Sequence, residues 1–569
     1  MESGRKDWQK TVKKESVKAA VGFWKKNNVW ILGALIGVTA FLCIYGVHVL
    51  NVTYTDWLLG GGSLTQNYLG WCFYRNSDWM FPIGLMDEIT YPNSVSVIYT
   101  DSVPLLAVFF KIFRGLLPED FQYFGLWGLL CFGAQGAFGA LLIFHYVKKK
   151  AEAVVGSLLF VLTPVMLGQV SVNMALGAQW LILLSLLLGI HRKEMSEKIS
   201  ALCWGLTGLL AAGLQLYFIP ICALVLLSFL ISDIFRRMKF RNDLVGLLAY
   251  LTASVGSVAL LGGFAHDHIP DSPALGQAGF NLNGLFNSQG WSIVFPSLEV
   301  YGSNADEGLA FPGTGVLLTL ATGCAAWLLR FLYKAVVKKE KNLFHFSWKK
   351  KENGVAYLIL IVLSVLVAVS PTVAWGSSVA MQVDVPDWLL GLWRRVGATG
   401  RFIWPVVYLV ILGSVVWMEK EMPWEAMAAV LLVIFSVYQV YDGKWQLMQR
   451  QVQFSTDYSY VSPLEDGKWD EWAEGSEIEH MVFVSYMLED VELMNELSVY
   501  AAENGMTVND FGSSCQTVKL EMTENLAKEL AQVREDTLYI YKMSDRDLCV
   551  NPEMEYVEVD GVIVGTAKT

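Results

Sequence analysis

The chain has 569 residues, of which 54% are hydrophobic and only 17% are charged, and its mean hydropathy is +0.41. An ordinary soluble domain is about one quarter charged, so this composition excludes a protein that lies wholly in water. The 21 Trp, 23 Tyr and 30 Phe are typical of a chain that anchors itself at two membrane–water interfaces.

The charge is divided unevenly along the chain. Residues 442–569 contain 26 acidic and 9 basic residues, whereas the preceding part contains 27 acidic and 33 basic residues. The basic residues occur in short runs between apolar segments, so we expect no nucleic-acid partner. The sequence therefore predicts a membrane-embedded part followed by an acidic domain in water.

The N-terminal segment 1–28 carries eight Lys and Arg residues and precedes an uncharged apolar stretch at 29–50. This stretch is long enough to span a bilayer, and no small-residue cleavage pattern follows it. We therefore predict a membrane anchor. The basic flank places the N-terminus in the cytoplasm.

Ten further apolar segments bring the prediction to about eleven membrane-spanning helices. They lie at 122–147, 153–168, 174–190, 199–213, 217–234, 244–264, 314–333, 355–373, 402–418 and 424–441. Alternate placement puts the basic runs, such as 148–150 and 334–351, on the cytoplasmic side. The C-terminus then lies outside the cytoplasm.

The segment 103–117 is apolar but short, and it contains Lys111 and Arg114. Counting it as a span would invert every later loop, so it is interpreted as an interfacial or re-entrant helix, with a short true span as the alternative. The predicted domains are then a basic cytoplasmic N-terminus, a membrane domain and an extracytoplasmic domain. They cover 1–28, 29–441 and 442–569, and the membrane domain has large outer loops at 51–121, 265–312 and 374–401.

The C-terminal region changes from membrane-type segments to alternating strands and helices. Strands are predicted at 480–486, 537–543 and 556–564, and helices at 489–504 and 523–535. This alternation predicts a small α/β domain. The region contains no G-x-G-x-x-G, P-loop or G-x-S-x-G motif, so we expect a lid or an acceptor-docking module.

Two carboxylates of the first outer loop are candidates for chemistry. Asp56 closely follows the first span, and Asp101 directly precedes the short apolar segment. Asp101 could accept a proton from a hydroxyl or hold a divalent cation. It could also only cap the helix that begins at Pro104, and composition alone favours capping.

Three arginines stand among tryptophans in the third outer loop, although the outer face is otherwise poor in cations. Arg394, Arg395 and Arg401 could bind a lipid-linked phosphate, because a guanidinium presents a planar fork of donors. They could equally snorkel or pair with nearby aspartates. Glu307 in the second outer loop could complete such a site or remain a solvated acid.

Two amides lie near the end of a predicted outer helix. Asn173 and Gln179 could hydrogen-bond a ligand or a neighbouring helix. Ionisable residues are otherwise nearly absent from the predicted spans, which disfavours a secondary transporter.

Several stretches resemble an uncharacterised bacterial family of multi-spanning membrane proteins, itself similar to the GT-C class of integral-membrane glycosyltransferases. The stretches are SLTQNYLGWCFYR, IYTDSVPLLAVFFKIFRGLLPEDFQYFGLWGLLCFGAQG, ALGAQWLIL, FNSQGWS, DEGLAFPG and ATGRFIWPVVYL. The resemblance implies a GT-C-like membrane domain with an extracytoplasmic α/β domain. It also implies transfer of a sugar from a polyprenyl-phosphate carrier.

The resemblance also nominates site residues. A catalytic carboxylate in the first outer loop would correspond to Asp101 or Asp56, and a donor-phosphate arginine to Arg401 with Glu307 as a loop partner. Ser63 and Asn67 stand where the family pattern has Asp and His, and the amides at 173 and 179 stand near the positions of its histidines. The substrate-binding candidates in the first outer loop are Gln66, Asn67 and Tyr68.

The sequence thus predicts a glycosyltransferase at the outer face of the membrane that modifies a cell-envelope acceptor. The expected partners are the lipid bilayer, a polyprenyl-phosphate-linked sugar and the acceptor, and a divalent cation is left open. The alternatives are a transporter or flippase of a lipid-linked precursor and a non-catalytic envelope scaffold.

Overall fold

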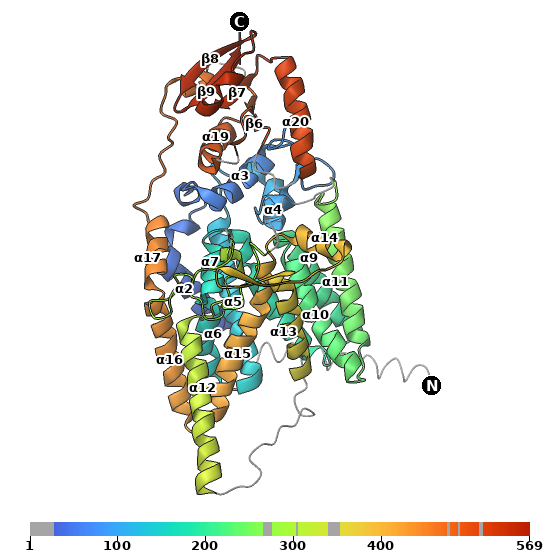
Figure 1. Cartoon of the computed structure of the whole chain (residues 1–569), viewed down its shortest axis with the longest axis vertical. Coiled ribbons are helices and arrows are strands. Elements are labelled where there is room, and N and C mark those ends of the chain that lie inside the picture. Colours follow the sequence, from blue (N-terminus) through green and yellow to red (C-terminus); the bar gives the residue numbers. More distant parts are fainter. Residues whose placement is uncertain are drawn as a thin grey trace, which may run out of the picture.

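The computed structural model describes residues 28–265, 276–302, 305–338, 353–474, 478–487, 490–510 and 516–568. It shows an elongated helical bundle with a small sheet domain at one end (Figure 1). We call the end of the bundle that carries this domain the domain end, and the other the opposite end. Each apolar segment predicted to span the membrane coincides with a helix of the bundle.

In the part of the chain that the structure describes, thirteen helices form the bundle. They are α2 (Val29–Tyr45), α5 (Phe124–Val147), α6 (Lys150–Val161), α7 (Pro164–Val170), α8 (Trp180–His191), α9 (Glu197–Leu214), α10 (Phe218–Phe235), α11 (Arg241–Leu260), α12 (Thr314–Leu332), α13 (Gly354–Val369), α15 (Trp404–Glu421), α16 (Glu425–Asp442) and α17 (Lys444–Gln453). Two pairs of them, α6 with α7 and α16 with α17, are bent at a short break. Within the described residues, six helices are long and apolar enough to cross a membrane, or up to eight if each of two bent pairs is one span. By these criteria the predicted count of about eleven is not confirmed, because α2 and α13 are shorter and α9 does not qualify.

Small residues let the helices approach one another closely. A Cβ atom on Gly33 of α2 would lie 2.4 Å from the carbonyl oxygen of Gly136 on α5, and one on Gly208 of α9 would lie 2.4 Å from that of Tyr250 on α11. Membrane helices pack through such contacts because lipid provides no hydrophobic drive for their association. The glycines therefore bring α2 onto α5 and α9 onto α11.

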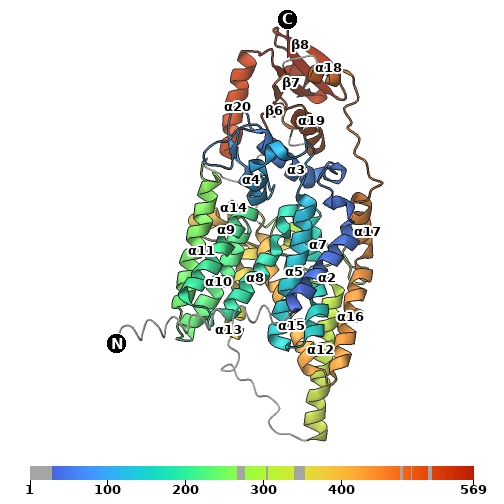
Figure 2. The same ribbon diagram turned by 180° about the vertical axis from the view of Figure 1, so that it is seen from behind.

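The first outer loop forms a compact cap at the domain end. It contains the short η2 (Asp56–Leu58) and η3 (Val97–Tyr99), the helices α3 (Gly62–Asn76) and α4 (Pro104–Ile112), and the two-residue strands β1 (Leu85–Met86) and β2 (Val95–Ser96). The nine residues of α4 extend only about 14 Å. A short true span at 103–117 is therefore excluded, and α4 lies beside α3 at the domain end (Figure 2).

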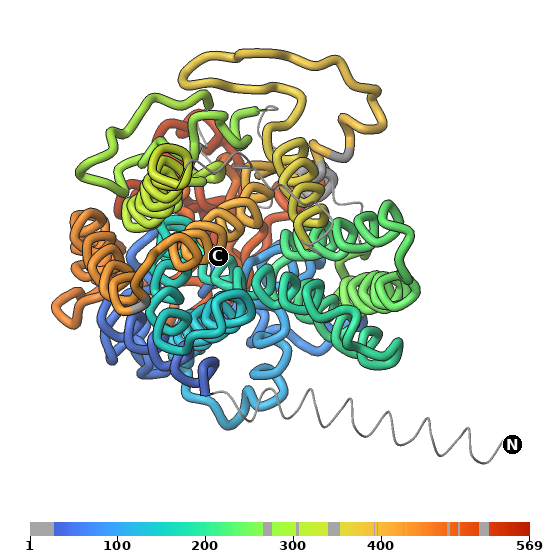
Figure 3. The backbone as a smooth tube through the Cα atoms, turned by 90° about the horizontal axis from the view of Figure 1, so that it is seen from below, coloured from blue at the N-terminus to red at the C-terminus, as the bar shows by residue number. Residues whose placement is uncertain are grey.

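The other two large loops project from the same side of the bundle (Figure 3). Residues 276–302 are largely irregular and lead to η6 (Ala305–Gly308). The third loop holds the antiparallel hairpin β3 (Thr372–Trp375) and β4 (Ser378–Gln382), then α14 (Asp387–Val396) and η9 (Thr399–Ile403). The predicted outer-loop residues 266–275, 303 and 304 lie outside the described residues.

The C-terminal domain is a five-stranded mixed sheet of order β6-β5-β7-β9-β8 with helices α18 (Lys468–Glu474), α19 (Val491–Glu503) and α20 (Gln516–Ala531). Its strands are β5 (His480–Phe483), β6 (Thr507–Val508), β7 (Thr537–Lys542), β8 (Met554–Val559) and β9 (Val562–Ala567). The prediction of one strand at 556–564 is wrong. The chain turns at Asp560 and Gly561, both at positive φ, and forms the hairpin β8–β9.

This domain binds the first outer loop through its edge strand. The amide of Val508 donates to the carbonyl oxygen of Glu88 at 2.7 Å, and that of Tyr91 donates to Val508 at 3.0 Å. The Tyr91 ring stacks on His480 with a centroid distance of 4.1 Å, and Arg534 Nη1 donates to the Tyr91 hydroxyl at 3.0 Å. The loop therefore hydrogen-bonds to the edge of the sheet, and the domain covers the cap.

A buried ion pair holds the bundle at its opposite end. Arg192 donates through Nε and Nη2 to the two carboxylate oxygens of Asp233, at 3.0 and 2.6 Å, and both side chains are almost fully buried. Its Nη1 donates to Asn353 Oδ1 at 3.1 Å. These contacts tie α10 and the start of α13 to the end of α8.

Replacing Arg192 by alanine leaves Asp233 buried without its cation. We expect Arg192→Ala to reduce the free energy of unfolding by about 3–5 kcal/mol, the usual cost of breaking a buried pair. Arg241→Ala is the control, because Arg241 is 78% exposed in its pair with Glu197 and should cost less than about 1 kcal/mol. Thermal unfolding of the full chain in detergent measures both. Equal losses would contradict a special role for the buried pair.

Candidate functional site

Asp101 lies in a strained stretch of backbone at the domain end. Its φ is 56°, and that of Val103 is 52°. Left-handed backbone is unusual for any residue with a side chain, and for a β-branched valine it is a clear outlier. The predicted capping role of Asp101 is wrong, because the N-cap of α4 is Val103 and no side chain caps this helix.

The Asp101 carboxylate is instead held by two amide side chains. Asn173 Nδ2 donates to Asp101 Oδ2 at 2.6 Å, and Gln215 Nε2 donates to Oδ1 at 2.5 Å. The Asn173 Oδ1 atom accepts from the backbone amide of Ala175 at 3.0 Å, and Gln215 Oε1 accepts from that of Tyr217 at 3.3 Å. These backbone contacts orient both amides, so each presents its N–H group to the carboxylate.

Both amides stand where a helix is interrupted. Asn173 is the N-cap of the short η5 (Met174–Gln179), which follows α7, and Gln215 is the C-cap of α9. Helix ends leave backbone groups without intrahelical partners, and short polar side chains satisfy them. The two helix ends that carry Asn173 and Gln215 therefore both contact the strained loop at Asp101.

Ser102 anchors the loop around Asp101 through two hydrogen bonds. The Ser102 hydroxyl donates to the carbonyl oxygen of Asn67 at 2.7 Å, and its own carbonyl accepts from the Tyr123 hydroxyl. Gly70 of α3 permits this approach, because a Cβ atom there would lie 2.4 Å from Ser102 Oγ. The geometry of Asp101 therefore depends on α3.

Arg401 and Glu307 form the second part of the site. Arg401 Nε and Nη2 donate to the two carboxylate oxygens of Glu307 at 2.6 and 2.7 Å. The guanidinium carbon lies 4.2 Å from the ring centroid of Tyr217, a cation–π contact. This pair joins η9 of the third outer loop to η6 of the second.

The two parts form one electrostatic cluster. Burial raises the pKa of the Asp101 carboxyl above its usual range, while the positive charge of Arg401 and the two amide donors lower it and Glu307 raises it further. Tyr217 links the parts directly, because its amide orients Gln215 and its ring lies against Arg401. The structure thus brings Asp101, Arg401 and Glu307 together.

The remaining predicted residues of the first outer loop lie elsewhere or contribute indirectly. Asp56 begins η2 and lies beside Tyr458, in the linker to the C-terminal domain. Asn67 Oδ1 accepts from the amide of Met174 at 3.3 Å, next to the Asp101 cluster. Gln66 is half-buried on α3, and Tyr68 of the same helix is buried.

Gln179 joins helices. Its Oε1 accepts from the Tyr408 hydroxyl of α15, and its Nε2 donates to the carbonyl oxygen of Val165 at 3.2 Å. This is the neighbouring-helix alternative of the sequence prediction. Arg394 is exposed on α14, and the side chain of Arg395 lies outside the described residues.

Sequence reasoning missed Gln215 and Tyr217. They lie in the short break at residues 215–217 between α9 and α10, where the sequence predicts a connector at 214–216 and the start of the next span at Tyr217. The polar side chains in this break were the signal that could have indicated a site. A break in lipid must provide hydrogen-bond partners for its free backbone groups, so polar residues there have a role.

The residues of this cluster do not fit a divalent cation. Both Asp101 oxygens accept from amide N–H groups, and both Glu307 oxygens accept from Arg401. Hard cations take about six or more oxygen ligands, and two carboxylates that protein donors already engage offer too few. In the described part of the chain, one group of His, Cys, Asp or Glu side chains has metal-ligand spacing, and it lies in the C-terminal domain at Glu479, His480 and Asp536.

Fold and site together define a multi-spanning membrane protein with a polar cluster at one end of its bundle. Its sequence matches the model of the family described as a domain of unknown function, DUF6311, over residues 34–444, and the model of the DUF6311 C-terminal domain over residues 468–567. The chain belongs to this family. No curated protein matches it.

Two solved structures of an archaeal oligosaccharyltransferase from Archaeoglobus fulgidus are similar to the chain. The apo form shares 12% identity with a TM-score of 0.42, and the match covers 91% of this chain and 70% of the other. The same archaeal oligosaccharyltransferase, AglB, in complex with an inhibitory peptide and a dolichol-phosphate shares 13% identity with a TM-score of 0.45, and the match covers 95% and 74% of the two chains.

A methyl group at Gly70 tests the dependence of the site on α3. We expect Gly70→Ala to destabilise the protein by about 1–3 kcal/mol, because its Cβ overlaps buried atoms of Thr100 and Ser102. Gly115→Ala is the matched control, since its Cβ would meet nothing within 4 Å. Thermal unfolding compares them, and an unchanged Gly70→Ala protein would show that the loop is not held against α3.

Proposed function

We propose that this chain transfers a sugar from a polyprenyl-phosphate carrier to a hydroxyl of a cell-envelope acceptor. The observation that carries the proposal is the half-buried Asp101 carboxylate, which is held by two oriented amides in strained backbone beside the Arg401–Glu307 pair. Strain and partly buried charge of this kind persist where a function needs them. The resemblance of the stretch around Asp101 to a glycosyltransferase-like family supports the same assignment.

In this proposal Asp101 is the general base. Each carboxylate oxygen keeps lone-pair capacity beyond its amide contact, so one can accept a hydrogen bond from the acceptor hydroxyl. Burial raises the pKa of Asp101 and makes the carboxylate a better proton acceptor. The acceptor oxygen attacks the anomeric carbon, its proton passes to Asp101, and the carbon–oxygen bond to the carrier phosphate breaks with inversion. The phosphate leaves with the bonding electron pair.

Arg401 stabilises the negative charge that develops on the departing phosphate. Glu307 accepts from one edge of the Arg401 guanidinium and fixes its direction. We therefore propose that Arg401 acts on the phosphate through its positive charge and its remaining N–H donors. Arg394 and Arg395 are further candidates for binding the carrier phosphate. Asn67 and Asn173 would position Asp101, with Gln66 and Tyr68 of α3 near the acceptor path.

The proposal includes the orientation of the chain. The bundle would cross the membrane about eleven times, with residues 1–28 in the cytoplasm and the domain end outside. The basic stretches at 148–150 and 192–193 follow α5 and α8, which begin at the domain end, so both lie at the opposite end as the positive-inside rule requires. The C-terminal domain, which covers the first outer loop, would act as a lid or acceptor-docking module.

A genetic experiment tests the transfer reaction. A strain that lacks the chain is complemented with the wild type, Asp101→Asn or Arg401→Lys, and its envelope glycans and lipid-linked sugars are analysed by mass spectrometry. We expect Asp101→Asn to leave at most about 1% of the wild-type glycan, because general bases contribute about 10²–10⁴-fold. The lipid-linked donor should accumulate.

Arg401→Lys keeps the positive charge but loses the planar pair of N–H donors, so we expect an intermediate loss of the glycan. Arg241→Ala, at the exposed pair of the opposite end, is the control and should restore the wild-type glycan. Equal membrane levels of all variants are confirmed by immunoblot. An unchanged glycan and donor profile for Asp101→Asn would refute the proposed transfer reaction.

A further inference from the structure

The hydroxyl of Tyr217 binds the end of the third outer loop. It donates to the carbonyl oxygen of Val396 at 2.6 Å and accepts from the backbone amide of Ala398 at 3.1 Å. These two residues flank Gly397, whose positive φ of 68° lies at the turn between α14 and η9. One hydroxyl therefore fixes both sides of the turn that leads to Arg401.

This hydroxyl connects the third outer loop to a particular part of the bundle. A neighbouring contact of the loop leads elsewhere, because Trp393 Nε1 donates to the carbonyl oxygen of Val367 on α13 at 3.1 Å. Tyr217 is the N-cap residue of α10, in the break between α9 and α10. The same break carries Gln215, one of the two amides that hold Asp101.

The ring and the backbone of Tyr217 contact both parts of the Asp101 cluster. The guanidinium carbon of Arg401 lies 4.2 Å from the ring centroid, and an aromatic face attracts a cation at this distance. The backbone amide of Tyr217 donates to Gln215 Oε1 at 3.3 Å, and Gln215 Nε2 donates to Asp101 at 2.5 Å. The residue therefore restrains Arg401 through its ring and Asp101 through its backbone.

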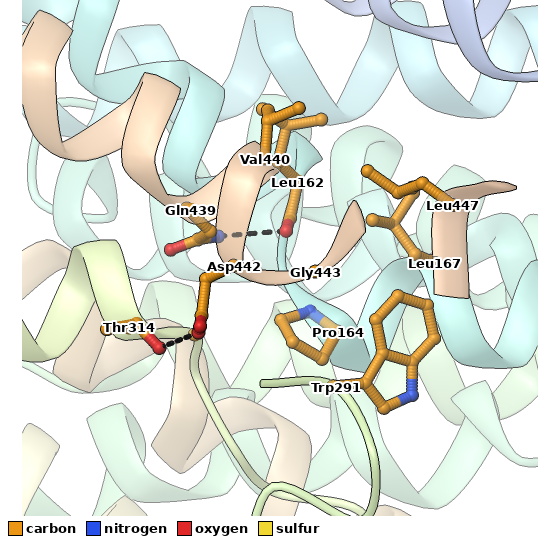
Figure 4. Close-up of a pocket in the computed structure, with 11 residues that line it drawn as sticks. Leu162, Pro164, Leu167, Trp291, Thr314, Gln439, Val440, Asp442, Gly443 and Leu447 are labelled. Atoms are coloured by element: carbon orange, nitrogen blue, oxygen red, sulfur yellow. Dashed lines mark hydrogen bonds between the residues drawn. The ribbon is translucent and has the colours of Figure 1, made fainter. Parts of the chain in front are cut away.

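Glu307, the partner of Arg401, is carried by a loop with an anchor of its own. Asp442 Oδ1 accepts from the amide of Ile293 in this second outer loop at 2.9 Å, and its Oδ2 accepts from the Thr314 hydroxyl. Figure 4 shows the contact to Thr314, which joins the end of α16 to the start of α12. The second loop is thus fixed on one side of the Arg401–Glu307 pair, and the tyrosine hydroxyl fixes the third loop on the other.

We infer that Tyr217 is a positioning residue, which aligns the Arg401 guanidinium with the Asp101 carboxylate. Its hydroxyl fixes the turn at 396–398, its ring restrains the guanidinium, and its backbone orients Gln215. The catalytic consequence rests on the proposed function, because Tyr217 acts on the transfer reaction through Arg401 and Asp101. The contact with the third loop can be measured without any transfer.

Limited proteolysis of the full chain in detergent tests the contact with the loop. Arg394 is exposed two residues before Val396, so tryptic cleavage after residues 394 and 395 reports how often the end of α14 opens. We expect Tyr217→Phe and Tyr217→Leu to speed this cleavage about 5-fold, as the loss of one net hydrogen bond predicts. Tyr250→Phe is the matched control, because the Tyr250 hydroxyl donates to Ile219 of α10 at 2.7 Å. It should leave the rate within about 1.5-fold of the wild type, since distant sites act independently.

The pH dependence of the envelope glycan in the complemented strain tests the alignment. The charge of Arg401 lowers the pKa of Asp101 more than that of Glu307 raises it. Tyr217→Leu removes the ring that restrains Arg401, so the pKa of the general base should rise. Because the base acts only when deprotonated, the medium pH at which the glycan falls to half should move upward. Tyr217→Phe and Tyr250→Phe should keep the wild-type pH, and a variant that only lost stability would lower the glycan at every pH.

Faster cleavage in both Tyr217 variants, together with the upward shift in Tyr217→Leu, would support the inference. Unchanged cleavage in Tyr217→Phe, or a half-maximal pH of Tyr217→Leu equal to that of the wild type, would overturn it. If Tyr217→Leu fails to fold, Tyr217→Met takes its place, because it also lacks an aromatic face. A strain whose glycans do not depend on the chain would refute the proposed function and the catalytic consequence with it, whereas the cleavage rates would still confirm or refute the loop contact.

Discussion

A half-buried carboxylate needs donors, and several elements of the domain end meet this requirement at Asp101. Its two oxygens receive N–H groups from Asn173 and Gln215, which stand at interruptions of different helices. Burial raises the pKa of Asp101, and the two neutral amides, whose hydrogen bonds lower it, leave the carboxylate charge uncompensated. A purely structural contact would gain more from a cation at this place, and the nearest one, Arg401, is instead paired with Glu307.

Two arginines show how the same side chain serves different ends. Arg192 connects helices at the opposite end of the bundle, and Arg401 connects two outer loops. Each arginine donates from Nε and Nη2 to both oxygens of a carboxylate. The carboxylates compensate the charges of Arg192 and Arg401, whose side chains are buried.

Hydropathy predicts the helices of this chain well, since each apolar segment folds as a helix, and it also indicates the acidic sheet domain. The capping prediction for Asp101 failed because the left-handed backbone at residues 101 and 103 turns the carboxylate away from α4, and such backbone leaves no mark in a single sequence. Gln215 was missed because its role depends on the fold bringing α9 to the first loop. The hairpin at 554–567 was read as one strand because Asp560-Gly561 is a two-residue turn.

The chemistry proposed for Asp101 requires the domain end to face away from the cytoplasm, because the carrier-linked sugar is used there. Single cysteines in a background without the native ones report this directly with a membrane-impermeant maleimide on intact cells. We expect a cysteine at the exposed position of Arg394 to be labelled, and one at the exposed position of Lys193 to be labelled only after permeabilisation. The reverse pattern would place the Asp101 cluster in the cytosol and contradict the account.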